Sequence, residues 1–340
     1  MSEKRKILSV LYICISITII TSTIYMQQIL SSHGEKDYIV YDEKLNNENI
    51  KDNDTDDAEY EENTVDIKEE KVEDEIEIDL EELVDGTEEI ETYVDPLFDE
   101  EVDILTRIES YLGDYKPYTS FIYYNLITGE QISFNEDIYM DAASLYKVGL
   151  SIVAYDMVNN GQVTLDDLIY YSPTQFQGGT GILQYDTSFG SLPLRTLLEY
   201  TIKYSDNIAA TMVYSYLGGW SNYRWKLFNL LNIDYGNYDN TTSARAEFET
   251  LKYLYDNREK YSLLIDDLKN TDFHDRLDKY LPQDKVAHKI GSDEGYTHDI
   301  GIVFTDEPYI IIMMTDNVYN GPDKIADISK AVYLYNTDNK

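Results

Sequence analysis

The sequence predicts an α+β domain in which a five-stranded antiparallel sheet is flanked by helices and accompanied by an all-α lobe. Two strand-like segments stand near the start of this domain, three stand near its end, and helical segments fill the interval. A transmembrane helix and a disordered acidic stalk are predicted to precede it. We therefore divide the 340 residues into a cytoplasmic tail (1–6), a transmembrane anchor (7–26), an acidic disordered linker (27–102) and a folded domain (103–340).

The anchor is predicted from residues 7–26, which contain no charged side chain. About 20 apolar residues in a helix span the hydrocarbon core of a bilayer. Lys4, Arg5 and Lys6 precede the segment, so the positive-inside rule places the N-terminus in the cytoplasm and the folded domain outside the cell membrane. The alternative is a cleaved signal peptide, but no small-x-small cleavage site follows the apolar segment.

Charge separates the linker from the rest of the chain. The net charge is −38, and residues 35–103 alone hold 31 acidic and 5 basic residues. Such a segment buries too little apolar surface to fold, so we expect a solvated stalk. The lack of clustered basic residues excludes a nucleic-acid partner, and the single cysteine, Cys14, excludes a disulfide scaffold.

The elements of the folded domain follow from hydrophobic spacing. Apolar residues on one face predict a helix over 103–115, and β-branched and aromatic residues predict strands over 118–124 and 131–134, joined as a hairpin. Three strands of an antiparallel meander are predicted over 285–292, 297–306 and 309–316. The remaining segments have helical spacing: 144–159, 192–204, 208–217, 220–231, 244–255, 259–268 and 324–335.

Three short motifs carry candidate chemistry, in the order Ser144-Leu145-Tyr146-Lys147, Ser205-Asp206-Asn207 and Lys289-Ile290-Gly291. A serine at the start of a helix has its lysine one turn further along the same face. A serine hydroxyl needs a neighbouring base to act as a nucleophile, and Lys147 can serve if burial and a nearby cation lower its pKa. Lys289 is the candidate cation, and Ser205 is a candidate proton shuttle. Backbone N–H groups of Ser144 and Ser292 could stabilise an oxyanion, so the pattern suits acyl transfer.

These motifs resemble those of class A β-lactamases and the related penicillin-recognising serine peptidases. The resemblance covers nearly all of residues 104–335 and includes the segments 178–184, 205–210, 241–244, 288–291 and 298–303. It implies Ser144 as nucleophile, Lys147 as general base and Ser205 as shuttle. It further implies that Asn207, Lys289, Gly291 and Ser292 bind the substrate, with Asn207 orienting Lys147 and Lys289 attracting a carboxylate. It requires no metal or organic cofactor.

Two departures from the family pattern bear on activity. Ile290 stands where the family has a threonine or serine, whose hydroxyl helps to hold the substrate carboxylate. The segment 231–240, which matches the Ω-loop, contains no glutamate to activate the deacylating water; Asp234 and Asp239 are its only carboxylates. Acylation is therefore better supported than fast deacylation.

The motif residues and the histidines also have structural interpretations. Ser144 and Lys147 could be a helix cap and a snorkelling lysine, and Ser205-Asp206-Asn207 could be a helix stop and restart. His288 and His298 could face each other across two strands; with no third ligand nearby, we expect cross-strand packing rather than a metal site. His274 has no readable role.

We expect a membrane-anchored, extracellular serine hydrolase that opens β-lactam amides, with slow deacylation possible. Alternatives are a D-Ala-D-Ala peptidase or another amide or ester hydrolase of the same fold, or an acyl-trapping, non-catalytic cell-wall sensor. The expected partners are a small-molecule or peptidoglycan-peptide substrate and the plasma membrane, and the expected state is a monomer.

Overall fold

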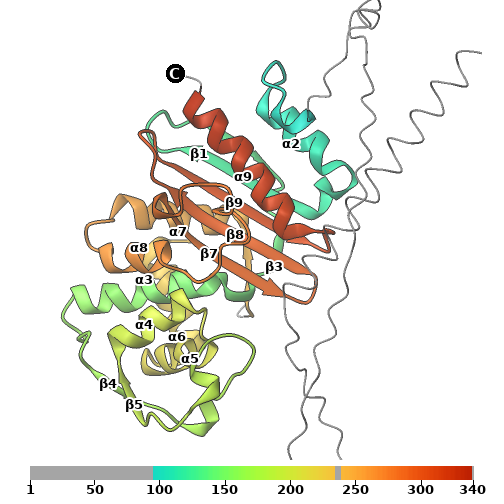
Figure 1. The fold of residues 1–340 in the computed structure, drawn as a ribbon. Coiled ribbons are helices and arrows are strands. Elements are labelled where there is room, and N and C mark those ends of the chain that lie inside the picture. The colour runs from blue at the N-terminus through green and yellow to red at the C-terminus, as the bar shows by residue number, and fades with distance from the viewer. Residues whose placement is uncertain (1–94, 234–238, 339–340) are drawn as a thin grey trace, which may run out of the picture. The chain divides into compact units, whose positions relative to one another are not determined.

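The computed structural model describes residues 95–233 and 239–338 (Figure 1). The predicted tail, the predicted anchor and residues 27–94 of the predicted linker lie outside the described residues. Among the helices that are described, none is both long and apolar enough to cross a bilayer. The fold begins before the predicted boundary, because the 3₁₀ helix η2 (Pro96–Phe98) buries Leu97 completely. The prediction that the linker extends to residue 102 is therefore wrong; acidic neighbours of Leu97 concealed a packed turn.

The five-stranded antiparallel sheet is confirmed, with the strand order β2-β1-β9-β8-β7. The hairpin joins the C-terminal meander because β1 pairs with β9, which places Ile122 opposite Ile312. The strands are β1 (Thr119–Asn125), β2 (Gln131–Phe134), β7 (Val286–Asp293), β8 (Tyr296–Val303) and β9 (Tyr309–Asp316). The last residue of β7 and the first of β8 pair as Asp293 and Tyr296, so these two strands form a tight hairpin.

Helices cover both faces of the sheet (Figure 1). Alternate residues of β9 point to opposite sides: Tyr309, Ile311 and Met313 join one apolar cluster, and Ile310, Ile312 and Met314 join the other. The first cluster is completed by α2 (Ile104–Leu112) and α9 (Gly321–Asp338). The second cluster includes apolar residues of two helices that pack on the other face of the sheet, α7 (Ala244–Asp256) and α8 (Ser262–Lys269). Because both faces are buried, β9 is apolar at six consecutive positions, from Tyr309 to Met314.

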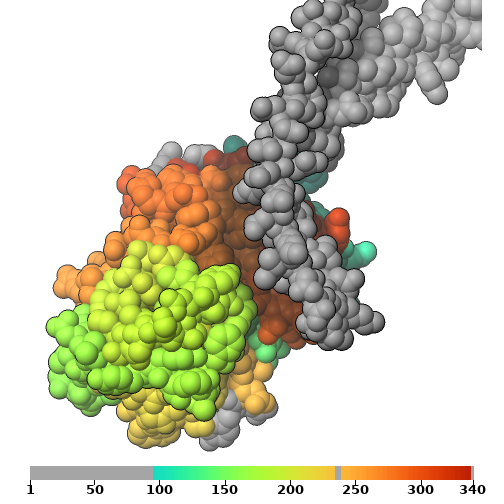
Figure 2. All heavy atoms as spheres, turned by 60° about the horizontal axis from the view of Figure 1, so that its bottom comes forward, coloured from blue at the N-terminus to red at the C-terminus, as the bar shows by residue number. Residues whose placement is uncertain are grey.

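An all-α lobe packs beside the sheet, as predicted. It consists of α3 (Tyr146–Asn159), α4 (Leu194–Lys203), α5 (Asn207–Tyr216) and α6 (Trp220–Leu231). Nine consecutive residues of α3, from Lys147 to Tyr155, are buried, so this helix is the centre of the lobe. Figure 2 shows the green and yellow surface of the lobe against the orange surface of the C-terminal part.

Several short elements were not predicted. Two pairs of three-residue strands are present, β3 (Tyr139–Asp141) with β6 (Thr241–Ser243) and β4 (Leu168–Tyr170) with β5 (Ser191–Pro193). Three residues are too few to show a periodicity. Short 3₁₀ helices also link the elements: η3 (Gly113–Tyr118), η4 (Ala143–Leu145), η5 (Pro173–Gln175), η6 (Leu183–Tyr185) and η7 (Gln283–Lys285).

The predicted helices all occur; the helix over 220–231 has the predicted ends, and the others differ by a few residues at one or both ends. The helix expected from residue 192 starts at Leu194, because residues 191–193 pair as β5. The helix expected from residue 259 starts at Ser262, and the last helix extends over 321–338 rather than 324–335.

Candidate active site

Ser144 lies in η4, a single 3₁₀ turn that leads directly into α3. Hydrogen bonds fix the backbone just before it: Ala143 N donates to Asp141 Oδ1 at 2.7 Å, and Asn240 Nδ2 donates to Ala143 O at 2.8 Å. Ala143 has φ of 46°, a left-handed conformation that costs energy in a residue with a Cβ. The Ser144 side chain caps neither helix, so a capping role does not explain this serine.

Lys147 follows one turn later on α3, and its side chain is fully buried. Its Nζ lies 3.0 Å from Ser144 Oγ and 3.2 Å from Ser205 Oγ. It also donates to Ser205 O at 2.6 Å and to Asn207 Oδ1 at 2.7 Å. Burial and then the Lys289 cation lower the pKa of Lys147 well below its usual value of 10.5, against the opposing effect of Asp206. Lys147 therefore does not snorkel, and its surroundings favour the neutral amine, which can accept a proton.

Ser205 and Asp206 lie between α4 and α5, and Asn207 is the first residue of α5. Asp206 is the part that caps a helix, because its Oδ1 accepts from Ala209 N at 2.9 Å and its Oδ2 accepts from Leu183 N at 2.8 Å. Ser205 has φ of 50°, which turns the chain so that its hydroxyl and carbonyl face Lys147. The segment thus restarts a helix, as the alternative reading supposed, and also presents two polar side chains to the lysine.

Lys289 reaches the same serine from β7. Its Nζ lies 3.0 Å from Ser205 Oγ and donates to Ile290 O at 2.8 Å, and the side chain is 1% exposed. Burial lowers the pKa of Lys289 to about 7; Asp299 opposes this shift and Arg276 adds to it. The hydroxyl of Ser205 is therefore placed between two amine groups. The three motifs that are far apart in the sequence meet at this point.

Gly291 makes this meeting possible. A Cβ at this position would lie 3.0 Å from Ala142 O and 3.1 Å from Leu145 Cγ. Such contacts are tighter than side chains tolerate without a shift of the neighbours. The glycine thus lets β7 approach the turn that carries Ser144.

A cavity of about 570 Å³ opens in front of these groups. Its lining includes Ser144, Ser205, Asn207 and Ser292, whereas Lys147, Lys289 and Gly291 are not on its surface. A larger cavity of about 710 Å³ lies between α2, β2 and α9 and contains none of the motif residues. We place the site at the smaller cavity because the reactive side chains line it.

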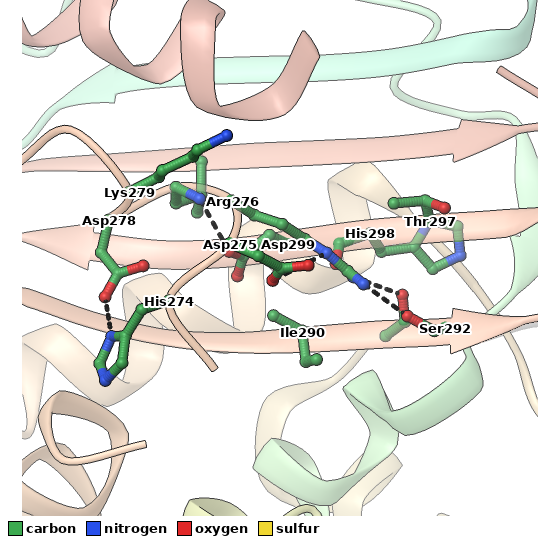
Figure 3. A network of polar contacts seen from close by, with 12 residues as sticks. His274, Asp275, Arg276, Asp278, Lys279, Ile290, Ser292, Thr297, His298 and Asp299 are labelled. Atoms are coloured by element: carbon green, nitrogen blue, oxygen red, sulfur yellow. Dashed lines mark hydrogen bonds and ion pairs between the residues drawn. The ribbon is translucent and has the colours of Figure 1, made fainter. Parts of the chain in front are cut away.

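Arg276 is a site residue that the sequence analysis missed. It is 5% exposed, lines the cavity, and donates from Nη1 to Gly291 O at 3.0 Å and to His298 O at 2.7 Å. Its Nη2 donates to Ser292 Oγ at 2.6 Å (Figure 3). Ile290 lines the same wall and offers no polar atom from its side chain. A lone arginine in a segment without periodicity gave no signal in the sequence.

The loop that matches the Ω-loop is described only in part, because residues 234–238 lie outside the described residues. Asp234 is therefore not placed. Asp239 is placed and does not line the cavity, whereas its neighbour Asn240 does.

His288 and His298 do not face each other across the two strands. The register pairs His288 with Gly301 and His298 with Gly291, so the two rings lie at different levels of the hairpin. His298 Nε2 contacts Asp141 O at 2.8 Å and its Nδ1 accepts from Thr315 N at 3.1 Å. Burial lowers the pKa of His298 to about 4, so this ring is neutral and structural.

Comparisons with known proteins agree with this geometry. A model of the β-lactamase enzyme family matches residues 103–336. A β-lactamase from Bacteroides uniformis is 24% identical over 242 residues, which cover 60% of this chain and 82% of that protein.

Solved structures share the fold. A PBP-A mutant in an acyl-enzyme complex with penicillin G has a TM-score of 0.61 at 24% identity, covering 69% of this chain and 96% of that one. A β-lactamase from Sphaerobacter thermophilus has a TM-score of 0.62 at 20% identity, covering 69% of this chain and 98% of that one.

Proposed function

Since the chain belongs to the β-lactamase enzyme family and is a serine hydrolase of that type, we propose that β-lactams acylate Ser144 and that the acyl group leaves slowly. The observation that carries the proposal is the 3.0 Å contact between Ser144 Oγ and a fully buried Lys147 Nζ. A buried amine with a lowered pKa is the activating base that a serine nucleophile requires.

Acylation follows from the contacts around Ser144. The neutral Lys147 amine takes the hydroxyl proton while Oγ attacks the lactam carbonyl carbon, and the carbonyl oxygen gains the negative charge. Backbone N–H groups of Ser144 and Ser292, on two sides of the cavity, are the proposed donors to that oxygen. The Ser205 hydroxyl contacts both amines and can pass a proton to the ring nitrogen as the C–N bond breaks.

Substrate binding is proposed to rely on charge. Arg276 lines the β7 side of the cavity and Lys289 lies behind it, so two basic residues favour a substrate carboxylate there. Asp275, whose Oδ1 lies 3.5 Å from Arg276 Nε, opposes this attraction in part. Asn207 holds Lys147 through its Oδ1 and donates from Nδ2 to Gly178 O at 2.8 Å, so its amide is fixed at the cavity wall. The side chain of Ile290 fills space at the cavity wall but cannot form a hydrogen bond, so the substrate carboxylate is bound less tightly.

Slow deacylation is the second half of the proposal. Hydrolysis of the ester needs a water activated by a base, and residues 231–240 contain no glutamate. Asp239, the described carboxylate of this segment, does not line the cavity. The acyl-enzyme is therefore expected to accumulate.

A D-Ala-D-Ala peptidase is the second candidate, favoured by the same missing glutamate. Acylation by a peptide and transfer to a better nucleophile than water need only the serine, the two lysines and the oxyanion donors. A related possibility is a sensor that reports acylation and does not turn over.

We also propose that residues 7–26 anchor the chain in the cell membrane with the enzyme outside. The proposal rests on the uncharged 20-residue segment and on Lys4, Arg5 and Lys6 before it. Protease treatment of intact cells should digest the folded domain and leave a cytoplasmic reporter at residue 1 protected.

Intact mass after mixing with penicillin G tests the acylation proposal. We expect a long-lived adduct of one penicillin on the wild-type chain and none on Ser144→Ala. Rapid return to the free mass with stoichiometric excess of product indicates a true β-lactamase, which contradicts slow release. A chain that stays free with both penicillin and a D-Ala-D-Ala peptide refutes both candidates.

A further inference from the structure

A cluster of metal-ligand side chains lies beside the catalytic site and takes no part in the proposed acyl transfer. His274, Asp278 and His288 each offer one ligand atom, and these three atoms lie within 4.8 Å of one another. His274 and Asp278 come from the segment between α8 and η7, one turn apart, and His288 comes from β7. Figure 3 shows the ring of His274 directed at the carboxylate of Asp278.

A second carboxylate fixes the orientation of His288. His288 Nδ1 lies 2.9 Å and 3.0 Å from the two oxygens of Asp299, which is fully buried. Leu277 N donates to Asp299 Oδ2 at 3.0 Å, so the carboxylate is itself held in place. This carboxylate–histidine arrangement is typical of histidines that bind a metal through the other ring nitrogen.

The other nitrogen faces a carboxylate without a hydrogen bond. His288 Nε2 lies 3.4 Å from Asp278 Oδ2, and both residues are 1% exposed. Neither His288 Nε2 nor Asp278 Oδ1 has a hydrogen-bond partner. With Nδ1 held by Asp299, Nε2 faces the Asp278 carboxylate in a dry environment. A cation at this point, a proton or a metal ion, offsets the charge of the buried carboxylate.

The spacing suits a small divalent cation. Tetrahedral zinc with bonds of about 2.0–2.1 Å separates its ligand atoms by about 3.3 Å. The 3.4 Å between His288 Nε2 and Asp278 Oδ2 matches that separation. His274 Nδ1 is hydrogen-bonded to the same Oδ2, so this ring has to move away from the carboxylate to share the ion. Two imidazoles and one carboxylate are a common zinc donor set. The His274 side chain is 38% exposed, so its ring can turn to admit the ion, and water can complete the coordination.

We propose that His274, Asp278 and His288 bind one zinc-type divalent cation, which ties the segment carrying Arg276 to the strand carrying Lys289. His274 and Asp278 flank Arg276 in the sequence, and His288 directly precedes Lys289. The ion therefore stabilises the wall of the cavity where Arg276 meets Ser292. The ion fixes the positions of Arg276 and Lys289 and takes no part in the acyl transfer.

Binding is tested on the full chain without an affinity tag, after treatment with EDTA, by titration with Zn²⁺ and with Co²⁺. We expect one equivalent of Zn²⁺ to bind, Co²⁺ to give the visible absorption of tetrahedral cobalt, and Zn²⁺ to raise the melting temperature. His274→Gln changes the exposed ligand and leaves the buried pair intact, so it should fold and lose at least tenfold in affinity. Asp284→Asn, an exposed carboxylate in the same region, is the matched control and should bind as the wild type does.

Absence of stoichiometric binding at micromolar Zn²⁺ overturns the proposal and leaves a proton as the cation that His288 shares with Asp278. Equal affinity in His274→Gln also overturns it, because the ion then binds elsewhere. Neither result affects the penicillin adduct on Ser144, so failure here is distinct from failure of the acylation proposal.

Discussion

The Nζ of Lys147 lies 3.0 Å from the Oγ of Ser144, and the lysine side chain is fully buried. The same Nζ is also hydrogen-bonded to Ser205 Oγ and Asn207 Oδ1, so the base is held in one position. We expect Lys147→Ala to slow acylation by penicillin by about 10²–10⁴-fold, the usual contribution of a general base. Stopped-flow acylation rates measure this, with Ser144→Ala as the zero-rate control. An unchanged rate would assign the base role to another group.

The advantage that a carboxylate gives a substrate in acylation should decrease as the pH rises through neutrality. The pKa of Lys289 is about 7, so its charge is present below pH 7 and is lost as the pH rises above it. The base Lys147 acts in the opposite sense, because the rate rises as it loses its proton, and its pKa is lowered well below 10.5. The contribution of the Lys289 charge to the second-order acylation rate with a carboxylate substrate should therefore decline above about pH 7.

Lys289→Arg is the matched variant for that pH dependence, because a guanidinium stays charged throughout the range. It should move the decline to higher pH, and an ester substrate without a carboxylate should not show the decline. If the wild-type chain and Lys289→Arg had identical pH profiles, this pH dependence could not be assigned to Lys289.

Restoring a hydroxyl at position 290 should improve substrate binding. Ile290 lines the cavity next to Lys289, and a hydrogen bond to a charged partner contributes about 1.5–3 kcal/mol. Ile290→Thr should therefore raise the second-order acylation rate by about tenfold or more for carboxylate substrates. Ile290→Val, which has the same branching without the hydroxyl, is the control and should leave the rate near the wild-type value.

Gly291→Ala should destabilise the domain and impair acylation together. The added Cβ would lie 3.0 Å from Ala142 O, behind the turn that carries Ser144. Overpacking of this kind costs about 1–3 kcal/mol in the free energy of unfolding. Urea denaturation measures the loss. Gly178→Ala is the comparison, because the nearest atom to its added Cβ lies at an ordinary contact distance of 3.5 Å. This variant should have nearly the stability of the wild type.

The proposed slow release should respond to an added nucleophile. If the ester persists because water is not activated, hydroxylamine should shorten the lifetime of the penicillin adduct in proportion to its concentration. The acylation rate should not change, because that step uses Lys147. Time-resolved intact mass separates the two rates, and a lifetime independent of hydroxylamine would mean that the ester is shielded from nucleophiles rather than lacking a base.

The order of elements and the three motifs were accessible from the sequence because both depend on local patterns. Apolar spacing within 144–159 predicts a buried helix whether or not its partners are known, and Ser144 and Lys147 share a face through helical periodicity alone. A single sheet built from strands at both ends of the domain was also predicted from their order, whereas the pairing of β1 with β9 is known only from the structure.

Contacts between distant segments were not accessible in this way. Arg276 has no periodic neighbours to mark it, and it reaches Ser292 only because the segment after α8 folds over the β7–β8 hairpin. His274 has no apparent role until β7 brings His288 to Asp278.

For this chain, the linear order of residues was sufficient to identify the reactive groups, since a helix turn and a motif are defined within a few positions. Burial, by contrast, is a property of the assembled molecule. The lowered pKa values of Lys147 and Lys289 exist because several elements exclude water from both amines at once, and no single segment carries that property.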